Sequence, residues 1–262
     1  MQTTIEQLYV YPVKSLAGVP VKQITFDEFG PKDDRQYLLV NSKGRFISQR
    51  SHPILATFTV DFAEQGWLVK APDSSSILIS KETYTDRSIE VTIWRDTLMA
   101  FEVDGCLSDW FSEQLNEIVY LVTFDDLTSR TVTAQGVAGK FAFADGYPLL
   151  VCNTATLDSV NRQSSQQLSM RRFRPNVVIS LAANTEYQVK ELRFENGGSL
   201  MFAEHCVRCN IPAIDPELGI FQRETHDYLK QALLRDNEVV FGMNAINKQL
   251  SRIQLGDVLT VY

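Results

Sequence analysis

Apolar and polar positions alternate over short distances through the N-terminal part of the chain. Runs rich in Val, Ile, Leu, Tyr and Phe are separated by Gly, Asp, Ser and Pro. A period of two is typical of strands that bury one face, and strands at such close spacing are typical of a barrel or a sandwich. We therefore expect strands at residues 5–13, 19–26, 36–41, 54–62, 67–70, 77–79, 89–94 and 98–103, and a hairpin return strand at 45–48.

The period changes after this region. Leu107, Phe111 and Leu115 recur at helical spacing, which predicts an amphipathic helix after Asp104-Gly105. The other expected elements are a helix capped by Asn153 or Thr154, a helix at residues 225–234, and strands at 177–180, 199–203 and 252–262.

A polar, turn-like stretch at residues 125–131 follows the first helix and favours a domain boundary near residue 120. The expected fold class is therefore α+β and β-rich. We expect a β domain at residues 1–120 and a second domain at 121–262.

Composition narrows the class of protein. With 44% hydrophobic and 22% charged residues, the chain of 262 residues has the make-up of a soluble globular protein. Its net charge of −7 argues against a general binder of nucleic acid or of anionic membranes. No apolar stretch approaches the roughly 20 residues that span a bilayer. The N-terminus lacks the pattern of a signal sequence, and four cysteines do not make a disulfide scaffold, so we expect a cytoplasmic location.

Two of the four cysteines, Cys206 and Cys209, lie three residues apart with Arg208 between them. They follow an apolar run and precede a loop rich in Pro and Gly. A fixed positive charge favours the thiolate over the thiol, and a thiolate can act as a nucleophile, a redox partner or a metal ligand. Two ordinary, partly buried cysteines remain an alternative.

A basic segment at residues 171–176 is the second candidate. Pro175 disfavours the helical region for Arg174, so we expect an extended segment that sends Arg172 and Arg174 to one face. Two adjacent guanidiniums repel unless an anion lies between them, and arginine binds phosphate through a bidentate fork. The alternative interpretation is a solvated basic loop.

Weaker candidates complete the set. They are the strand ends that carry Lys14 with Ser15 and, separately, Arg50, and the tight turn Asp145-Gly146-Tyr147. The sequence has no serine elbow, phosphate-binding Walker loop or dinucleotide fingerprint, which argues against those three classes of enzyme.

Taken together, these segments resemble the MOSC family, named after the C-terminal domain of molybdenum-cofactor sulfurase. The likeness is strongest to the branch that holds the amidoxime-reducing components and bacterial proteins with a fused ferredoxin. It rests on segments that occur in the family's order: residues 11–15, Arg50 before His52-Pro53, 143–148, 173–178, Cys206-x-Arg208-Cys209 and Asp215-Pro216-x-x-Gly219.

The resemblance implies a site and a cofactor. It implies that Cys209 is the catalytic residue and binds molybdenum, and that a molybdopterin supplies the rest of the molybdenum cofactor. The implied contacts to the cofactor are Lys14, Ser15, Arg50, Asp145, Gly146, Tyr147, Arg174, Asn176, Arg208 and Cys209. The implied fold is an N-terminal β domain at 1–120 packed on a MOSC β-barrel at 121–262.

The activity that the resemblance implies is an oxidoreductase acting on small N-hydroxylated compounds. Because the sequence ends after the expected barrel, we expect electrons from a separate ferredoxin- or cytochrome b5-like protein. Two departures from the family pattern, Val207 and Pro212-Ala213, lie near the cysteines. Two alternatives stay open: a non-catalytic carrier of the cofactor, and a sulfur-transfer protein with a persulfide on Cys209.

Overall fold

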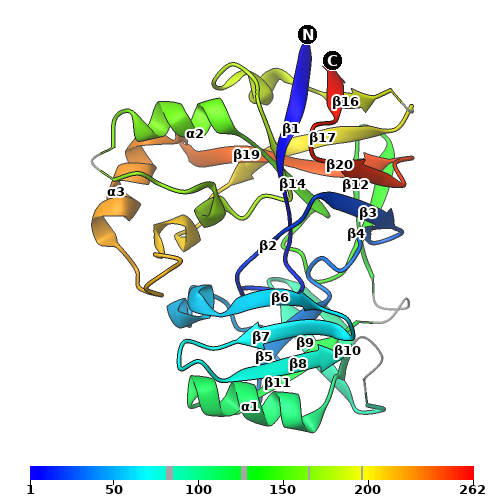
Figure 1. Ribbon diagram of the computed structural model, residues 1–262, viewed down its shortest axis with the longest axis vertical. Helices are drawn as coiled ribbons and strands as arrows, with labels where there is room; N and C mark the ends of the chain where they lie inside the picture. Colours follow the sequence, from blue (N-terminus) through cyan, green and yellow to red (C-terminus); the bar gives the residue numbers. More distant parts are fainter. Residues whose placement is uncertain (81–84, 125–128, 165, 196) are drawn as a thin grey trace.

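Seven strands close a β-barrel in the upper half of the molecule (Figure 1). The computed structural model describes residues 1–80, 85–124, 129–164, 166–195 and 197–262. In order around the barrel the strands are β14 (Leu149–Asn153), β15 (Val177–Ile179), β1 (Gln2–Val10), β21 (Val258–Val261), β16 (Glu191–Phe194), β17 (Ser199–Val207) and β19 (Glu238–Lys248). The barrel closes because β19 pairs with β14. Among these seven strands, all within the described residues, β14 and β15 form the one parallel pair.

A second layer of sheets lies below the barrel (Figure 1). A four-stranded sheet holds β5 (Tyr37–Asn41), β11 (Val119–Thr123), β10 (Asp96–Glu102) and β9 (Ser88–Ile93), and a three-stranded sheet holds β6 (Thr59–Ala63), β7 (Gly66–Lys70) and β8 (Ser76–Ser80). Helix α1 (Gly105–Leu115) packs against β11 and β8.

Smaller elements connect the two layers and cover the barrel. The short strands are β2 (Val19–Pro20), β3 (Gln23–Asp27), β4 (Gly30–Pro31), β12 (Arg130–Ala134), β13 (Val137–Phe141), β18 (Leu234–Arg235) and β20 (Arg252–Gln254). The helices are α2 (Thr154–Asn161) and α3 (Arg223–Ala232), with 3-10 turns η1 (Pro53–Thr57), η3 (Met170–Phe173), η4 (Thr185–Gln188) and η5 (Ile211–Ala213). The structure thus confirms the β-rich α+β class.

Strand pairing crosses the expected domain boundary, because β1 lies between β15 and β21 in the barrel. The division at residue 120 stays a prediction. This prediction rests on the polar stretch at residues 125–131. Residues 125–128 lie outside the described part of the chain, and β12 begins at Arg130.

The cap expected at Asn153 forms, and Asp104 caps α1. The side chain of Asp104 accepts a hydrogen bond from the backbone N–H of Cys106, and Asn153 accepts one from Ala155. Each cap satisfies a backbone donor that the first turn of a helix leaves without a partner.

Three expected strands differ from the structure. The strand expected at 19–26 is divided into β2 and β3. Residues 45–48 make only isolated bridges, Val40 to Phe46 and Arg45 to Thr92, so no return strand forms there. The strand expected at 54–62 begins only at Thr59, because Pro53 starts the 3-10 turn η1. Proline favours the first position of a helical turn, since that position needs no N–H donor.

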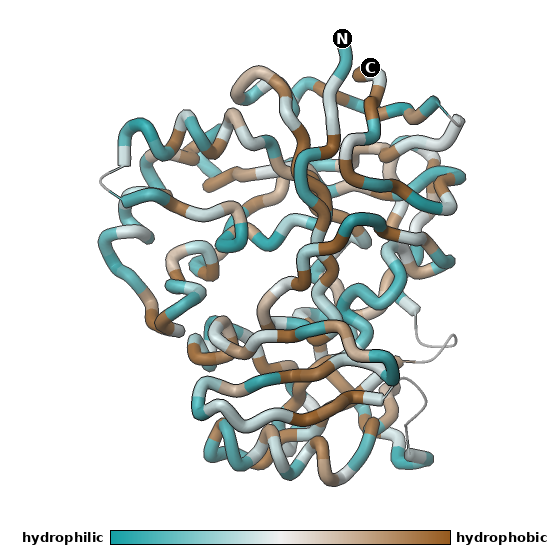
Figure 2. The backbone as a smooth tube through the Cα atoms, in the orientation of Figure 1, coloured by the Kyte–Doolittle hydropathy of each residue, from teal (hydrophilic) through white to brown (hydrophobic). Residues whose placement is uncertain are grey.

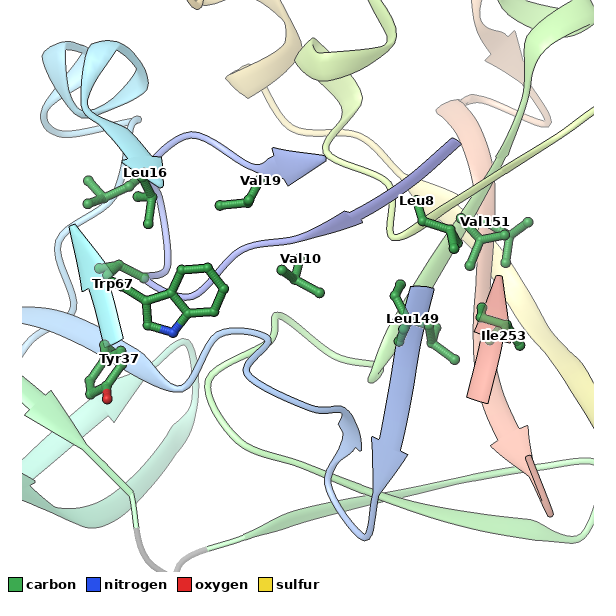
Figure 3. Close-up of a cluster of buried hydrophobic side chains, with 14 of the residues drawn as sticks. Leu8, Val10, Leu16, Val19, Tyr37, Trp67, Leu149, Val151 and Ile253 are labelled. Carbon is green, nitrogen blue, oxygen red and sulfur yellow. The ribbon is translucent and has the colours of Figure 1, made fainter. Parts of the chain in front are cut away.

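One continuous apolar core runs through both layers. Figure 3 shows Leu8, Val151 and Ile253 on the barrel side and Leu16, Tyr37 and Trp67 on the other, with Val10 and Val19 between them. In Figure 2 the hydrophobic segments follow these interior strands, whereas the outer turns are mainly hydrophilic. Burial of apolar surface across the junction therefore holds the two layers together.

No helix within the described residues is long and apolar enough to cross a bilayer.

Candidate functional site

A pocket of about 250 Å³ lies where the two layers meet. Its wall combines the turn after β1, the segment after β5, the 144–150 segment before and within β14, the turn after η3 and the end of β17. All ten residues expected from the sequence line it: Lys14, Ser15, Arg50, Asp145, Gly146, Tyr147, Arg174, Asn176, Arg208 and Cys209. The fold thus brings together segments that are far apart in the sequence.

Lys14 lies at the turn that follows β1. Its ammonium is buried, and it donates hydrogen bonds to the carbonyl of Phe143 at 2.6 Å and to Oδ1 of Asp145 at 2.7 Å. Burial lowers the pKa of Lys14 to about 8, although the Asp145 carboxylate opposes that change. The next residue, Ser15, has a φ of 76°, a left-handed conformation that a non-glycine residue adopts only where its surroundings fix it.

Asp145 joins Lys14 to the turn between β9 and β10. Its Oδ1 also accepts a hydrogen bond from the indole N–H of Trp94 at 3.0 Å. Desolvation raises the pKa of Asp145, but the Lys14 ammonium outweighs it, so the pKa lies below its usual range. The carboxyl group is 67% exposed, so it is solvated as well as paired. Asp145 therefore neutralises one cation of the pocket and fixes the indole.

Arg50 lies against the face of that indole, with its guanidinium 4.0 Å from the Trp94 ring centroid. A guanidinium over a tryptophan face is attracted by the negative ring face. Trp94 thus holds Arg50 by its face and Asp145 by its edge.

Arg174 differs from the sequence expectation. It is left-handed, with φ 59° and ψ 46°, and not extended, because the preceding residues form η3. Its guanidinium and that of Arg35 lie on the Tyr11 ring, at 4.4 and 4.1 Å from the centroid, and it donates to the carbonyl of Leu16 at 2.7 Å. Burial lowers the pKa of Arg174 to about 10, so it stays charged at neutral pH.

The extended segment expected at Arg172 and Arg174 was wrong, and Arg172 does not line the large pocket, although both arginines line a small neighbouring one. The Arg172 guanidinium is buried in a separate ion pair with Asp215 at 2.9 Å and also donates to the carbonyl of Ile214. Arg172 anchors the 211–216 segment, and only Arg174 lines the large pocket.

Asn176 is buried, and four hydrogen bonds occupy its side-chain amide. Its Nδ2 donates to the carbonyl of Tyr9 and to Asp34, and its Oδ1 accepts from Arg35 and from the backbone of Leu150. These bonds use the full capacity of a primary amide. In this structure Asn176 therefore orients Arg35.

The two cysteines lie at the end of β17. This strand shifts its register with β19 between Phe202 and His205 and again between His205 and Val207. Such irregularities turn the side chains that follow. Cys206 is half-buried in the strand, whereas Cys209 is exposed in the following segment.

Arg208 contacts the first cysteine of the pair. Its Nη1 lies 3.0 Å from Sγ of Cys206, and its Nη2 donates to the carbonyl of Phe173 at 2.9 Å. Its buried Nε finds no acceptor among the described residues. Arg208 therefore keeps an unused donor.

Several residues of the pocket wall were not found by sequence reasoning. Arg35 and Trp94 are the most important, and Gln49 joins them because its Nε2 donates to the carbonyl of Ser15 at 2.6 Å. Arg35 stands in the polar turn 32–36 and Trp94 in a hairpin turn, so neither has a pattern that distinguishes it from an ordinary surface residue.

Tyr147 and Gly146 complete the wall beside Asp145. Tyr147 is half-buried, and burial together with the nearby Glu204 carboxylate raises the pKa of its hydroxyl.

The pocket carries an excess of positive charge, although the whole chain is acidic. Five cations line it: Lys14, Arg35, Arg50, Arg174 and Arg208. Lys14 and Arg35 pair with Asp145 and Asp34. For Arg50, Arg174 and Arg208, the described residues provide no carboxylate within 4.0 Å. A dense group of unpaired guanidiniums suits an anionic ligand.

The fold and site together define a β-barrel protein whose cationic pocket contains a cysteine side chain. The models of the MOSC N-terminal beta barrel domain and of the MOSC domain match residues 2–117 and 138–260, so the chain belongs to the MOSC family.

Several named proteins are similar in sequence to this protein over most of its length. Mitochondrial amidoxime reducing component 2 from Macaca fascicularis is 25% identical, and its human counterpart 24%, each over 97% of this chain and 82% of the relative. Human molybdenum cofactor sulfurase is 24% identical over 94% of this chain and 30% of its own length. The crystal structure of the YUAD protein from Bacillus subtilis has a similar fold, with a TM-score of 0.50 and 10% identity over 99% of this chain and 94% of that protein.

Proposed function

We propose that the chain is a molybdenum-cofactor-binding oxidoreductase that reduces N-hydroxylated compounds. One observation carries the proposal: Arg50, Arg174 and Arg208, each without a carboxylate partner among the described residues, surround the same pocket as Cys209. The amidoxime reducing components and the molybdenum cofactor sulfurase among the relatives support it.

The residues present fit such a cofactor. A pterin that carries a phosphate is anionic, and three unpaired guanidiniums with a free Arg208 Nε offer donors to it. Thiolate is a suitable ligand for a soft metal centre, and Cys209 is exposed in the pocket wall. The cofactor, when bound, would supply two-electron oxygen-atom chemistry.

The side chains would hold the cofactor in distinct ways. Arg174 and Arg50, fixed on aromatic rings, would bind its anionic end in a set orientation. Lys14 would neutralise part of the negative charge of the cofactor. Ser15 and the Asp145-Gly146-Tyr147 turn would lie against the pterin. We assign Asn176 a positioning role, because its amide is already saturated by protein partners.

The net reaction consumes two electrons and two protons. The N–O bond of the substrate breaks, an N–H bond forms, and the oxygen leaves as water. We propose that a separate protein of the ferredoxin or cytochrome b5 type supplies the electrons. All four cysteines are free, which fits a reducing compartment, and we propose the cytoplasm.

The test is expression in a host that makes the molybdenum cofactor, followed by metal and pterin analysis of the purified chain. Turnover of benzamidoxime to benzamidine is then measured with a chemical reductant that replaces the natural donor. Bound molybdenum with turnover supports the proposal. Bound molybdenum without turnover supports a carrier, and absence of both contradicts the proposal.

A sulfur-transfer function is the second candidate, and the molybdenum cofactor sulfurase among the relatives favours it. In that case Cys209 would carry a persulfide. Intact-mass analysis before and after a thiol reductant would detect the additional sulfur atom. Its absence after incubation with a persulfide donor, which transfers its outer sulfur and leaves as a thiol, would contradict this function.

Binding of an anion to the pocket should weaken as the pH rises through about 8, the pKa of buried Lys14. An anion favours the charged ammonium, so affinity is full below this pKa and falls as the proton leaves, by up to about tenfold at pH 9. Sulfate is a suitable probe because its charge stays constant, and calorimetry on the chain gives its affinity.

Lys14→Arg provides the control, because arginine keeps its charge through this range. The variant should bind sulfate with little change between pH 7 and 9. An equal decline in the variant and the parent chain would assign the effect to another group.

A further inference from the structure

A second pocket, of about 200 Å³, lies beside Cys209. It is bounded by the 208–213 segment, by α3 and by the start of β19, elements that lie next to one another in Figure 1. The backbone N–H of Arg208 donates to the carbonyl of Val239 at 2.7 Å, which fixes this wall to the barrel. Arg208 and Cys209 line both pockets, so they form a shared wall.

The two pockets differ in chemistry. The first is dominated by cations, whereas Ala213, Leu229, Leu233 and Val239 give the second a largely apolar wall. A dry apolar cavity of about 150 Å³ can hold a benzene molecule, so the second pocket has room for one ring with a small substituent. A mostly apolar wall with a few polar groups is typical of a site that binds a small molecule.

The charged groups at this pocket are of one sign. Arg208 and Lys230 line it, and no Asp or Glu is among its described lining residues. His226 also lines this pocket. The carboxylate of Asp227 interacts with His226 and with Arg223. A cationic ligand would therefore meet repulsion from Arg208 and Lys230, whereas a neutral one would not.

We propose that this second pocket binds the apolar body of the substrate and selects the neutral N-hydroxylated compound over its cationic product. This inference rests on the proposed reductase function. An amidoxime is neutral at neutral pH, whereas the amidine formed from it is protonated. The ring enters the apolar pocket with its N–OH end at Cys209. The amidine formed by the two-electron, two-proton reduction takes up one further proton from solvent, and its positive charge then lies beside Arg208 and Lys230, which favours release.

The test measures binding without turnover, on the purified chain with no reductant present. Calorimetry or ligand-observed NMR should show that benzamidoxime binds at least about tenfold more tightly than benzamidine, a difference of about 1.4 kcal/mol. Equal affinities, or no binding of benzamidoxime, would overturn the proposal.

Two variants locate the binding. Val239→Phe fills the pocket from a half-buried position and should weaken benzamidoxime binding about tenfold or more. Leu229→Ala enlarges the pocket and should improve the binding of a naphthyl amidoxime relative to benzamidoxime. Leu157→Ala removes the same side chain from the same apolar cluster but away from the pocket, and it should leave that ratio unchanged.

The failures of the two proposals are distinguishable. A chain without molybdenum or turnover would contradict the reductase function, whatever it binds. A chain with both, in which Val239→Phe leaves benzamidoxime binding intact, would overturn only the second pocket as the substrate site. Thermal unfolding of each variant establishes that a lost signal does not come from a lost fold.

Discussion

Replacing Cys209 by alanine is expected to lower N-hydroxy reduction by more than about 100-fold and to lower the molybdenum bound per chain. Cys209 is exposed in the wall of the cationic pocket, and the resemblance assigns to its position the bond to the metal. Under the proposed function, the cationic side chains of the variant would still attract the pterin, but the protein would lack its ligand to the metal. Metal analysis and turnover on the same preparation separate these two effects.

Two cysteine variants serve as controls. Cys106 lies exposed in the first turn of α1, outside the pocket, and Cys106→Ala should leave both measurements unchanged. Cys206→Ala removes the contact to Arg208 at 3.0 Å and should lower cofactor content only moderately, because Arg208 keeps its bond to Phe173. Full activity and full molybdenum in Cys209→Ala would contradict the assignment.

The sequence predicted the pocket better than it predicted the backbone around it. Neither Lys14 nor Cys209 indicates a binding site on its own. Their segments occur in the order found in the family, and this order indicates that they contribute to one site. Arg35 and Trp94 escaped because their roles depend on contacts across the fold, to Tyr11 and Asp145. Nothing in the residues around them records those contacts.

The backbone errors have local causes. A proline disfavours the helical region for the residue before it, which led to an extended Arg174, but the left-handed region remains open where tertiary contacts fix it. The longest strand, β19, was not expected, because both of its faces are buried over much of its length and its apolar run has no alternation. Pattern reasoning works best where one face meets water.

Removal of the Arg174 side chain is expected to reduce anion binding by about 10- to 100-fold, the effect of losing one charged hydrogen-bonding partner. Arg174 has no carboxylate partner among the described residues, and its guanidinium is held between the Tyr11 ring and the carbonyl of Leu16. Little rotational freedom is therefore lost when an anion binds. Sulfate affinity of the chain and pterin content after expression both report the loss.

Two replacements of Arg174 separate the effect of the lost side-chain charge from the effect of backbone conformation. Arg174 has a positive φ, so Arg174→Ala loses the charge and keeps the backbone strain that arginine already carries, whereas Arg174→Gly loses the charge and relieves that strain. Both variants should bind sulfate equally weakly. The alanine variant should unfold at a lower temperature than the glycine variant. Arg171→Ala removes the same charge from an exposed neighbour outside the pocket and should leave sulfate binding unchanged. All three variants lose one positive charge. If Arg171→Ala lowered the sulfate affinity as much as the Arg174 variants do, long-range attraction, and not direct contact between Arg174 and the anion, would determine that affinity.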